Sequence, residues 1–497
     1  MAREPSTPTA TPYNGGSPKK ECNDVFFLLI FLGVFVMTIV FGVTYGGTLV
    51  DITKAKDLSG SSGFKLVLEY AVYAGMLSTL LSISWIVVLM FMGEFMIWFT
   101  LASMILACIL TAIFMTKRLH ELGDSYYWWP AAVFGTAALL LGLYTYCIRN
   151  RVKFAAKHLK VAGSALFRLP LIFVVTIAMV GVQLAWGVAW VAGTFGLLNR
   201  IGYIDIPAAC TDNVVSSKTA CNVHINYGGV VGIFFLMLFV FFWGALVVEG
   251  IVAVTVAGTV GTWRNNVAAP CITVSSWLRA STLNLGSICF GSLAVAILET
   301  IRAVVGVVQY IAAAEGNCVL SCIAGCLQCI LSCIQGWMEV FNRYAFTYVG
   351  LHGFSFVTAG RHVTDLFASK GWTAIVNDDL ASWVFFLGNL VVGALSAWIG
   401  LHFVDDISSK AVFPGVAKPE YLVVISAFLI GYIVNSVFMT VMASAVTTVF
   451  VLWAEDPQGW QLTHPDHYAR LHAAWLQVHP NEYNDGHGKA TTPAAAV

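Results

Sequence analysis

The sequence predicts an all-α membrane protein that crosses the bilayer about ten times, with both termini in the cytosol. Its 497 residues are 58% hydrophobic and only 10% charged, whereas soluble proteins carry about 25% charged residues. The mean hydropathy is +0.80, so most of the surface has to face lipid. The formal net charge of zero argues against a nucleic-acid partner.

The crossings are counted from the apolar runs, because about 20 apolar residues span a bilayer as a helix. Nine runs reach that length, and a tenth crossing is expected within the ambiguous region 318–358. The nine runs are 25–45, 66–91, 95–116, 128–148, 169–198, 228–257, 283–313, 381–403 and 421–452. Several exceed 25 residues, which indicates tilt or extension beyond the bilayer.

Clustered basic residues orient these crossings. Region 149–168 holds six Lys or Arg and no acid, and we expect it to be a cytosolic loop, because basic residues concentrate on that side. Region 258–280, two crossings later, adds Arg264 and Arg279 without an acid and is expected on the same side. With ten crossings, both termini are cytosolic.

Three domains follow from composition. Residues 1–24 are rich in Pro, Ser, Thr and Gly and are predicted to be a disordered cytosolic tail. Residues 25–453 form the transmembrane domain. Residues 454–497 are predicted to be a cytosolic tail, in which HYARLHAAWL indicates a short amphipathic helix.

The region between the fifth and sixth crossings, 199–227, is expected outside the cytosol. It holds Cys210 and Cys221 on either side of a polar turn. Two cysteines on the oxidising side of a membrane favour a disulfide. Two free thiols are the alternative.

Ionisable residues inside apolar runs are costly unless they are paired or face water, so they point to function. Glu69, Glu94, Glu249, Glu299 and Arg302 have this context. Glu249 is the strongest candidate for a functional carboxylate. Glu299 and Arg302 lie three residues apart on one helical face, where a structural ion pair and a substrate contact are equally open. For Glu94, a turn at the membrane interface is favoured.

Tryptophans occur along the same runs. Trp186 and Trp190 are four residues apart and share a helical face, and Trp243 precedes Glu249 by six residues. Aromatic faces together with a carboxylate suit a quaternary ammonium ion, which cannot donate hydrogen bonds. These residues are candidates for substrate binding, with lipid-facing or helix-packing tryptophans as the alternative.

Motifs for catalysis are missing from the sequence. It contains no Walker loop, HExxH or GxSxG pattern, and the apolar runs show no set of metal ligands or paired nucleophile and base. We therefore assign no catalytic residue, metal or cofactor, and expect transport rather than catalysis.

The segment CVLSCIAGCLQCILSCI holds five cysteines at helical spacing. They are Cys318, Cys322, Cys326, Cys329 and Cys333. One stripe on one helix does not converge as metal ligands do, and small apolar thiols suit tight helix packing. Packing is the favoured interpretation, while S-palmitoylation at a membrane edge and metal or redox sensing stay open.

Five segments of the C-terminal half resemble the choline transporter-like family. GSICFGSLAVAILETIR is similar to the family's GSLxFGSLxxAxxQxxR segment, and the cysteine-rich run and FNRYAFTYVGLHGFSFVTAGRHVTDLF follow in the family's order. WVFFLGNLVVGAL and TTVFVLWAEDP complete a match over residues 281–457. The resemblance implies ten crossings, cytosolic termini and transport of choline or ethanolamine.

The sequence departs from that family at three places. The region 51–65 is short where animal members have a large domain, which points to the fungal, plant or protist branch. Glu299 stands where the family has Gln, and Thr447 stands where it has Asp. A carboxylate gained and another lost are expected to change cation preference or coupling.

Taken together, these features predict a plasma-membrane transporter of a small organic cation, most simply choline, with the lipid bilayer as its other partner. A non-transporting receptor or trafficking scaffold is the main alternative. A lipid-modifying enzyme and a channel are further alternatives, and the oligomeric state is open.

Overall fold

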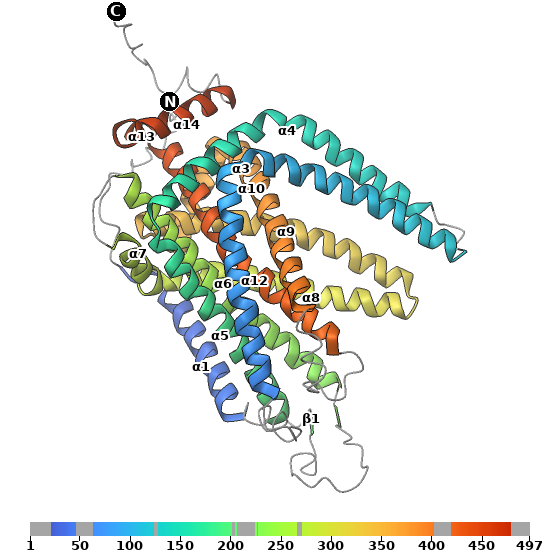
Figure 1. The fold of residues 1–497 in the computed structure, drawn as a ribbon. Coiled ribbons are helices and arrows are strands. Elements are labelled where there is room, and N and C mark those ends of the chain that lie inside the picture. Colours follow the sequence, from blue (N-terminus) through green and yellow to red (C-terminus); the bar gives the residue numbers. More distant parts are fainter. Residues whose placement is uncertain are drawn as a thin grey trace, which may run out of the picture.

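The computed structural model describes residues 21–45, 63–123, 128–200, 204–205, 224–225, 227–265, 271–401 and 419–478. Helices make up nearly all of this part of the chain (Figure 1). They are α1 (Val25–Tyr45), α3 (Gly63–Glu121), α4 (Trp129–Arg168), α5 (Leu171–Arg200), α6 (Tyr227–Arg264), α7 (Ile272–Ser281), α8 (Leu285–Ala314), α9 (Cys318–His352), α10 (Phe356–Gly400), α12 (Pro419–Glu455), α13 (Pro457–Thr463) and α14 (Pro465–Val478). Strands β1 (Ile204–Asp205) and β2 (His224–Ile225) pair antiparallel.

The predicted polytopic all-α class is confirmed. Within the described residues, nine helices are long and apolar enough to cross a membrane. Helix α9 supplies the crossing expected in region 318–358. Helix α3 bends at Met92, where φ is −119° and ψ is 23°, and its apolar part is 50 residues long. That length accommodates two crossings of about 20 residues each.

Two helical hairpins project to the right of the other helices in Figure 1. One is formed by the second half of α3 and the first half of α4, and the other by α8 and α9. The remaining long helices, including α5, α6 and α12, pack together beside them. The connected ends of α8 and α9 therefore lie away from the main bundle (Figure 1).

Residues that adjoin the first and last crossings meet at one end of the bundle. Oδ2 of Asp24, which precedes α1, accepts hydrogen bonds from the Ser287 hydroxyl at 2.7 Å and the Phe356 N–H at 2.9 Å. His352 Nε2 lies 3.5 Å from Glu455 Oε2 at the end of α12. An even number of crossings returns the chain to its starting side, which agrees with two crossings for α3. That this end faces the cytosol stays a prediction.

Region 149–168 is not a loop, and that expectation is wrong. It forms the second half of α4, with Arg149, Lys153 and Lys160 exposed and Leu159 buried. Lys153 and Lys160 follow Arg149 at four and eleven positions, about one and three helical turns, so these three residues occupy one face of an amphipathic helix. Charge asymmetry concerns the side of the membrane and does not determine whether the backbone is a loop or a helix.

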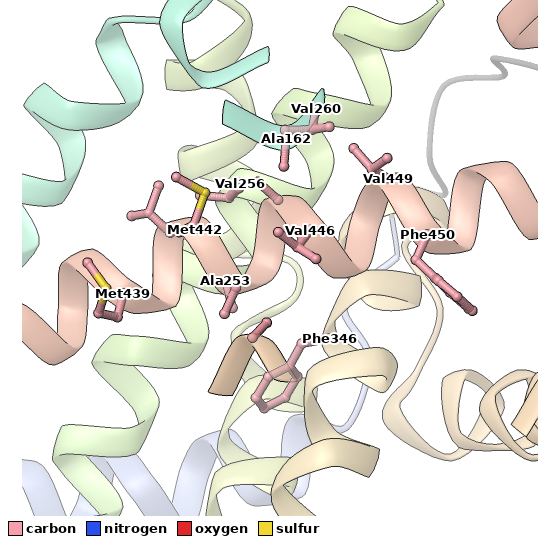
Figure 2. Packing of buried hydrophobic residues seen from close by; sticks show 14 of the residues in the cluster. Ala162, Ala253, Val256, Val260, Phe346, Met439, Met442, Val446, Val449 and Phe450 are labelled. Atoms are coloured by element: carbon pink, nitrogen blue, oxygen red, sulfur yellow. The ribbon is translucent and has the colours of Figure 1, made fainter. Parts of the chain in front are cut away.

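Helix α12 forms the centre of the hydrophobic core. Figure 2 shows its residues Met442, Val446 and Phe450 among side chains from α4, α6 and α9. Met442 and Phe450 are fully buried. The helices around α12 are therefore positioned by contacts with it.

Helices α6 and α9 cross at a pair of glycines. A Cβ atom on Gly350 would lie 2.7 Å from the Val254 carbonyl oxygen, and one on Gly258 would lie 3.2 Å from the Gly350 oxygen. Small residues allow such backbone contact between membrane helices. This crossing fixes the distance between two helices that carry cavity residues.

An ion pair attaches the C-terminal helices to the bundle. Arg264 Nη2, at the end of α6, donates to the Asp456 carbonyl oxygen and to its Oδ2, both at 2.7 Å. Partial burial would raise the pKa of Asp456, but hydrogen bonds from Arg264 and the Gly459 N–H favour the carboxylate and bring the pKa below its ordinary value. The pair is therefore charged at neutral pH.

Two histidines complete this attachment. The His464 ring stacks on Trp263 with centroids 4.3 Å apart, and His467 Nε2 lies 3.4 Å from the Ser164 hydroxyl of α4. Burial and nearby arginines lower the pKa of both histidines. Helix α14, with Trp475 buried, contains the amphipathic helix predicted from HYARLHAAWL.

Acidification should loosen α13 and α14. A histidine whose pKa is lowered by folding binds its proton more readily when undocked, so docking is strongest at neutral pH and weakens as pH falls below about 6.5. We expect faster hydrogen exchange in residues 457–478 at pH 5.5 than at pH 7.5, after correction for the intrinsic rates. The double variant His464→Phe, His467→Phe should lose most of this difference. Equal corrected rates at both pH values in the unmodified protein would contradict the prediction.

Candidate functional site

A cavity of about 1100 Å³ lies between helices α4, α5, α6, α8, α9, α10 and α12. Pockets for small molecules usually span roughly 300–1,000 Å³, so this one is large enough for a small organic solute and water. Its charged lining residues are Glu249, Glu299, Arg302, Glu339 and Arg343. The cavity therefore contains two of the carboxylates singled out in the sequence.

Helix α6 directs Glu249 toward helix α12. Glu249 Oε1 accepts a hydrogen bond from the Ser436 hydroxyl at 3.0 Å. Glu249 is half-buried and lines the cavity. An ionised carboxylate has about four acceptor positions, and the single neutral donor leaves others available to a ligand.

Glu299 and Arg302 are connected through Gln335 of α9. Arg302 Nη1 donates to Gln335 Oε1, and Gln335 Nε2 lies 3.5 Å from Glu299 Oε1. A neutral amide thus lies between the two residues, for which the sequence left a structural ion pair and a substrate contact equally open.

Glu339 is a third cavity carboxylate, and it was not recognised from the sequence. Gln335 Nε2 donates to Glu339 Oε1 at 2.6 Å, four residues further along α9. The polar residues around Glu339 interrupt the apolar run, so region 318–358 had no clear helix boundaries. A helix starting at the cysteine-rich segment would have put Gln335 and Glu339 on one face.

Acids outnumber bases among the described residues of the cavity lining. These residues include three carboxylates and two guanidinium groups, which leaves one uncompensated negative charge when all are ionised. Arg343 donates to the Ser382 hydroxyl at 2.9 Å. Aromatic side chains surround these groups, among them Phe241, Phe242, Trp337, Trp383, Phe385, Phe386 and Tyr432. Aromatic faces and a net negative charge together favour an organic cation.

The three tryptophans predicted to bind substrate lie outside the cavity lining. The indole N–H groups of Trp186 and Trp190 donate to the carbonyl oxygens of Phe241 and Met237 in α6, at 3.2 and 2.6 Å. Trp243 donates in the same way to the Cys289 oxygen of α8 at 3.0 Å. All three therefore join neighbouring helices, which was the alternative interpretation of these residues.

Glu94 and Thr447 were also singled out in the sequence, and neither is among the lining residues of the cavity. Glu94 is exposed and helical, two residues after the kink at Met92, and its position at a membrane interface stays a prediction. Thr447 is buried, and its hydroxyl donates to the Ala443 carbonyl oxygen at 3.0 Å. The side chain of Glu69 lies outside the described residues, as do Cys210 and Cys221 with their predicted disulfide.

The cysteine stripe does not pack between helices, and that expectation is wrong. Cys318, Cys322, Cys326, Cys329 and Cys333 are all exposed free thiols. Ala324, Leu331 and Gln335 are the buried residues in this part of α9. At 3.6 residues per turn, the two stripes point about 150° apart on the helix. Among the described residues, no group of three or more Cys, His, Asp or Glu is arranged to hold a metal ion.

Comparison with known proteins identifies the family of the chain. The family model for the plasma-membrane choline transporter matches residues 132–458. The chain belongs to this family. It is 27% identical to Protein PNS1 of Mycosarcoma maydis over 478 residues, covering 93% of this chain and 84% of the relative. It is 26% identical to Protein PNS1 of Debaryomyces hansenii, covering 93% and 88%.

A third relative matches a shorter stretch. Protein pns1 of Aspergillus fumigatus is 30% identical over 277 residues, covering 53% of this chain and 50% of the relative. These relatives are fungal, in agreement with the branch inferred from the short 51–65 region. The family resemblance is confirmed, and the cavity lies within the matched range, since its lining residues run from Tyr144 to Ser444.

The indole of Trp186 should contribute mainly to stability. Trp186→Phe removes the hydrogen bond to α6 and should reduce the free energy of unfolding by about 1 kcal/mol, seen as a lower unfolding temperature in detergent. Trp337→Phe, at a side chain that is 60% exposed, is the matched control and should leave that temperature nearly unchanged. Equal shifts for the two variants would show that the helix contact of Trp186 is unimportant.

Proposed function

We propose that this protein carries choline, or a close relative such as ethanolamine, across the plasma membrane through the cavity described above. The observation that supports it best is the lining itself, with three carboxylates, two guanidinium groups and a surround of aromatic side chains. One uncompensated negative charge suits a monovalent cation. The family to which the chain belongs provides independent support.

The composition of the lining favours a quaternary ammonium ion. Methylated ammonium groups are weakly hydrated and interact with aromatic faces, which Trp383, Phe242 and Tyr432 offer. A primary ammonium also needs hydrogen-bond acceptors, which the carboxylates of Glu249 and Glu339 supply. We therefore infer that choline is preferred and that ethanolamine competes for the same site.

Substrate would reach the cavity by alternating access. In this proposal the helices around the cavity rock so that it opens first to one side of the membrane and then to the other. The sequence has no ATP-binding motif, so transport is facilitated or coupled to an ion gradient. A channel is the alternative transport mechanism, and it differs in that its flux does not saturate.

Choline uptake by the purified protein in liposomes tests the proposal. Uptake should saturate with choline concentration and exceed that of empty liposomes. Glu249→Gln should raise the KM for choline about tenfold, equivalent to about 1.4 kcal/mol of binding, because it removes a carboxylate from the lining while keeping its shape. Its unfolding temperature should change little, because the amide can still accept from Ser436.

Glu94→Gln is the matched control, because it neutralises a carboxylate that is exposed at the kink of α3. It should leave the KM unchanged. Wild-type uptake no greater than that of empty liposomes would refute transport, and would favour the receptor or scaffold alternative if choline also gave no thermal shift.

A further inference from the structure

A buried amide contacts three ionisable side chains that line the cavity. Gln335 is only 7% exposed. Its Oε1 accepts from Arg302, while its Nε2 donates to Glu339 at 2.6 Å and lies 3.5 Å from Glu299. Both ends of one neutral side chain are thus occupied by charged groups of opposite sign.

The orientation of this amide matches the charges around it. A glutamine has one end that only accepts and one that only donates, so its oxygen faces the guanidinium and its nitrogen faces the carboxylates. Arg302 Nη1 therefore has a partner without direct pairing to either acid, whereas the buried Nε has no hydrogen-bond partner among the described residues. Arg302 and both carboxylates contact the same amide, so without it the guanidinium is free to pair with an acid, and such a charge-assisted pair is strong away from bulk water.

The backbone around this cluster is held by other contacts. Gln328, two turns earlier on α9, donates through Nε2 to the Arg302 carbonyl oxygen at 2.6 Å. Asn342 of α9 donates to the Gly291 carbonyl oxygen of α8 at 2.7 Å. The α8–α9 hairpin therefore does not depend on Gln335 to stay together, and the effect of Gln335 is on the side chains.

We propose that Gln335 is a positioning residue that keeps Arg302 from neutralising Glu299 and Glu339, and so sets the affinity of the cavity for an organic cation. The inference rests on the proposed function. With the amide present, the carboxylates keep oxygens available to the ligand. When Arg302 pairs with them, the cavity loses most of its attraction for a cation.

Choline uptake into liposomes by four variants tests this inference. Gln335→Met keeps the length of the side chain but removes both of its polar ends. It should raise the KM about tenfold while changing the maximal rate less than about twofold, because binding rather than the transport step is affected. Adding Arg302→Gln to Gln335→Met should bring the KM back to within about threefold of wild type, because the competing guanidinium is gone.

Two further variants separate positioning from packing. Gln328→Met makes the same chemical change on the same helix, at a side chain that bonds to backbone, and should lower the unfolding temperature without raising the KM. Gln335→Glu supplies Arg302 with its own carboxylate, so the KM should stay near or below the wild-type value. If Gln335→Met does not fold, Gln335→Glu still tests the inference, because a KM well above the wild-type value would contradict it.

The outcomes distinguish the two proposals. An unchanged KM in Gln335→Met, or no recovery when Arg302→Gln is added, overturns the role of Gln335 while leaving choline transport intact. A higher KM in Gln335→Glu does the same. Absence of saturable uptake by the wild-type protein overturns the proposed function and this inference together.

Discussion

Buried polar atoms without access to water have to find partners inside the protein, and this requirement shapes the bundle around α12. Lipid offers no hydrogen bonds, so unsatisfied groups are costly there. The Ser444 hydroxyl donates to the Ala253 carbonyl oxygen of α6 at 2.7 Å, and the Asn435 amide donates to Asn389 Oδ1 of α10 at 2.6 Å. Small polar groups therefore fix the position of the central helix against two neighbours, and apolar packing fills the rest.

The same requirement governs the charged residues of the cavity. The hydrogen bonds described for the carboxylates of Glu249 and Glu339 come from a hydroxyl and an amide. Neutral donors satisfy part of a carboxylate without cancelling its charge. Direct ion pairs would be more stable as isolated contacts at short range, but they would leave the cavity with less charge to attract a ligand. In the proposed function, this arrangement keeps carboxylate oxygens available to a cation.

Sequence reasoning recovers those features that depend on a residue and its immediate context. The crossings follow from hydropathy, and Glu249 and Glu299 stand out because they interrupt long apolar runs. Helix α9 is harder, because Gln335 and Glu339 weaken its apolar signal, and both were missed.

Features that depend on the neighbouring helix are not visible in the sequence. The spacing of Trp186 and Trp190 places them on one face of α5, but it does not show that carbonyl oxygens of α6 lie opposite. Trp186 also packs against Gly244 of α6, a fit that no local pattern reveals. For the cysteine stripe, helical spacing identified the face correctly, whereas the direction in which that face points depends on where α8 lies.

The contacts of Asp24 connect the first turns of α8 and α10, so these helix ends are expected to move together. One carboxylate oxygen joins the beginning of α8, through Ser287, to the beginning of α10, through Phe356. A rearrangement that separates those two helix ends has to break both hydrogen bonds, whereas one that moves them as a rigid unit keeps both. Asp24, just before the first crossing, therefore links two later helices. Through it, the start of α1 is mechanically coupled to α8 and α10, which contribute to the walls of the cavity.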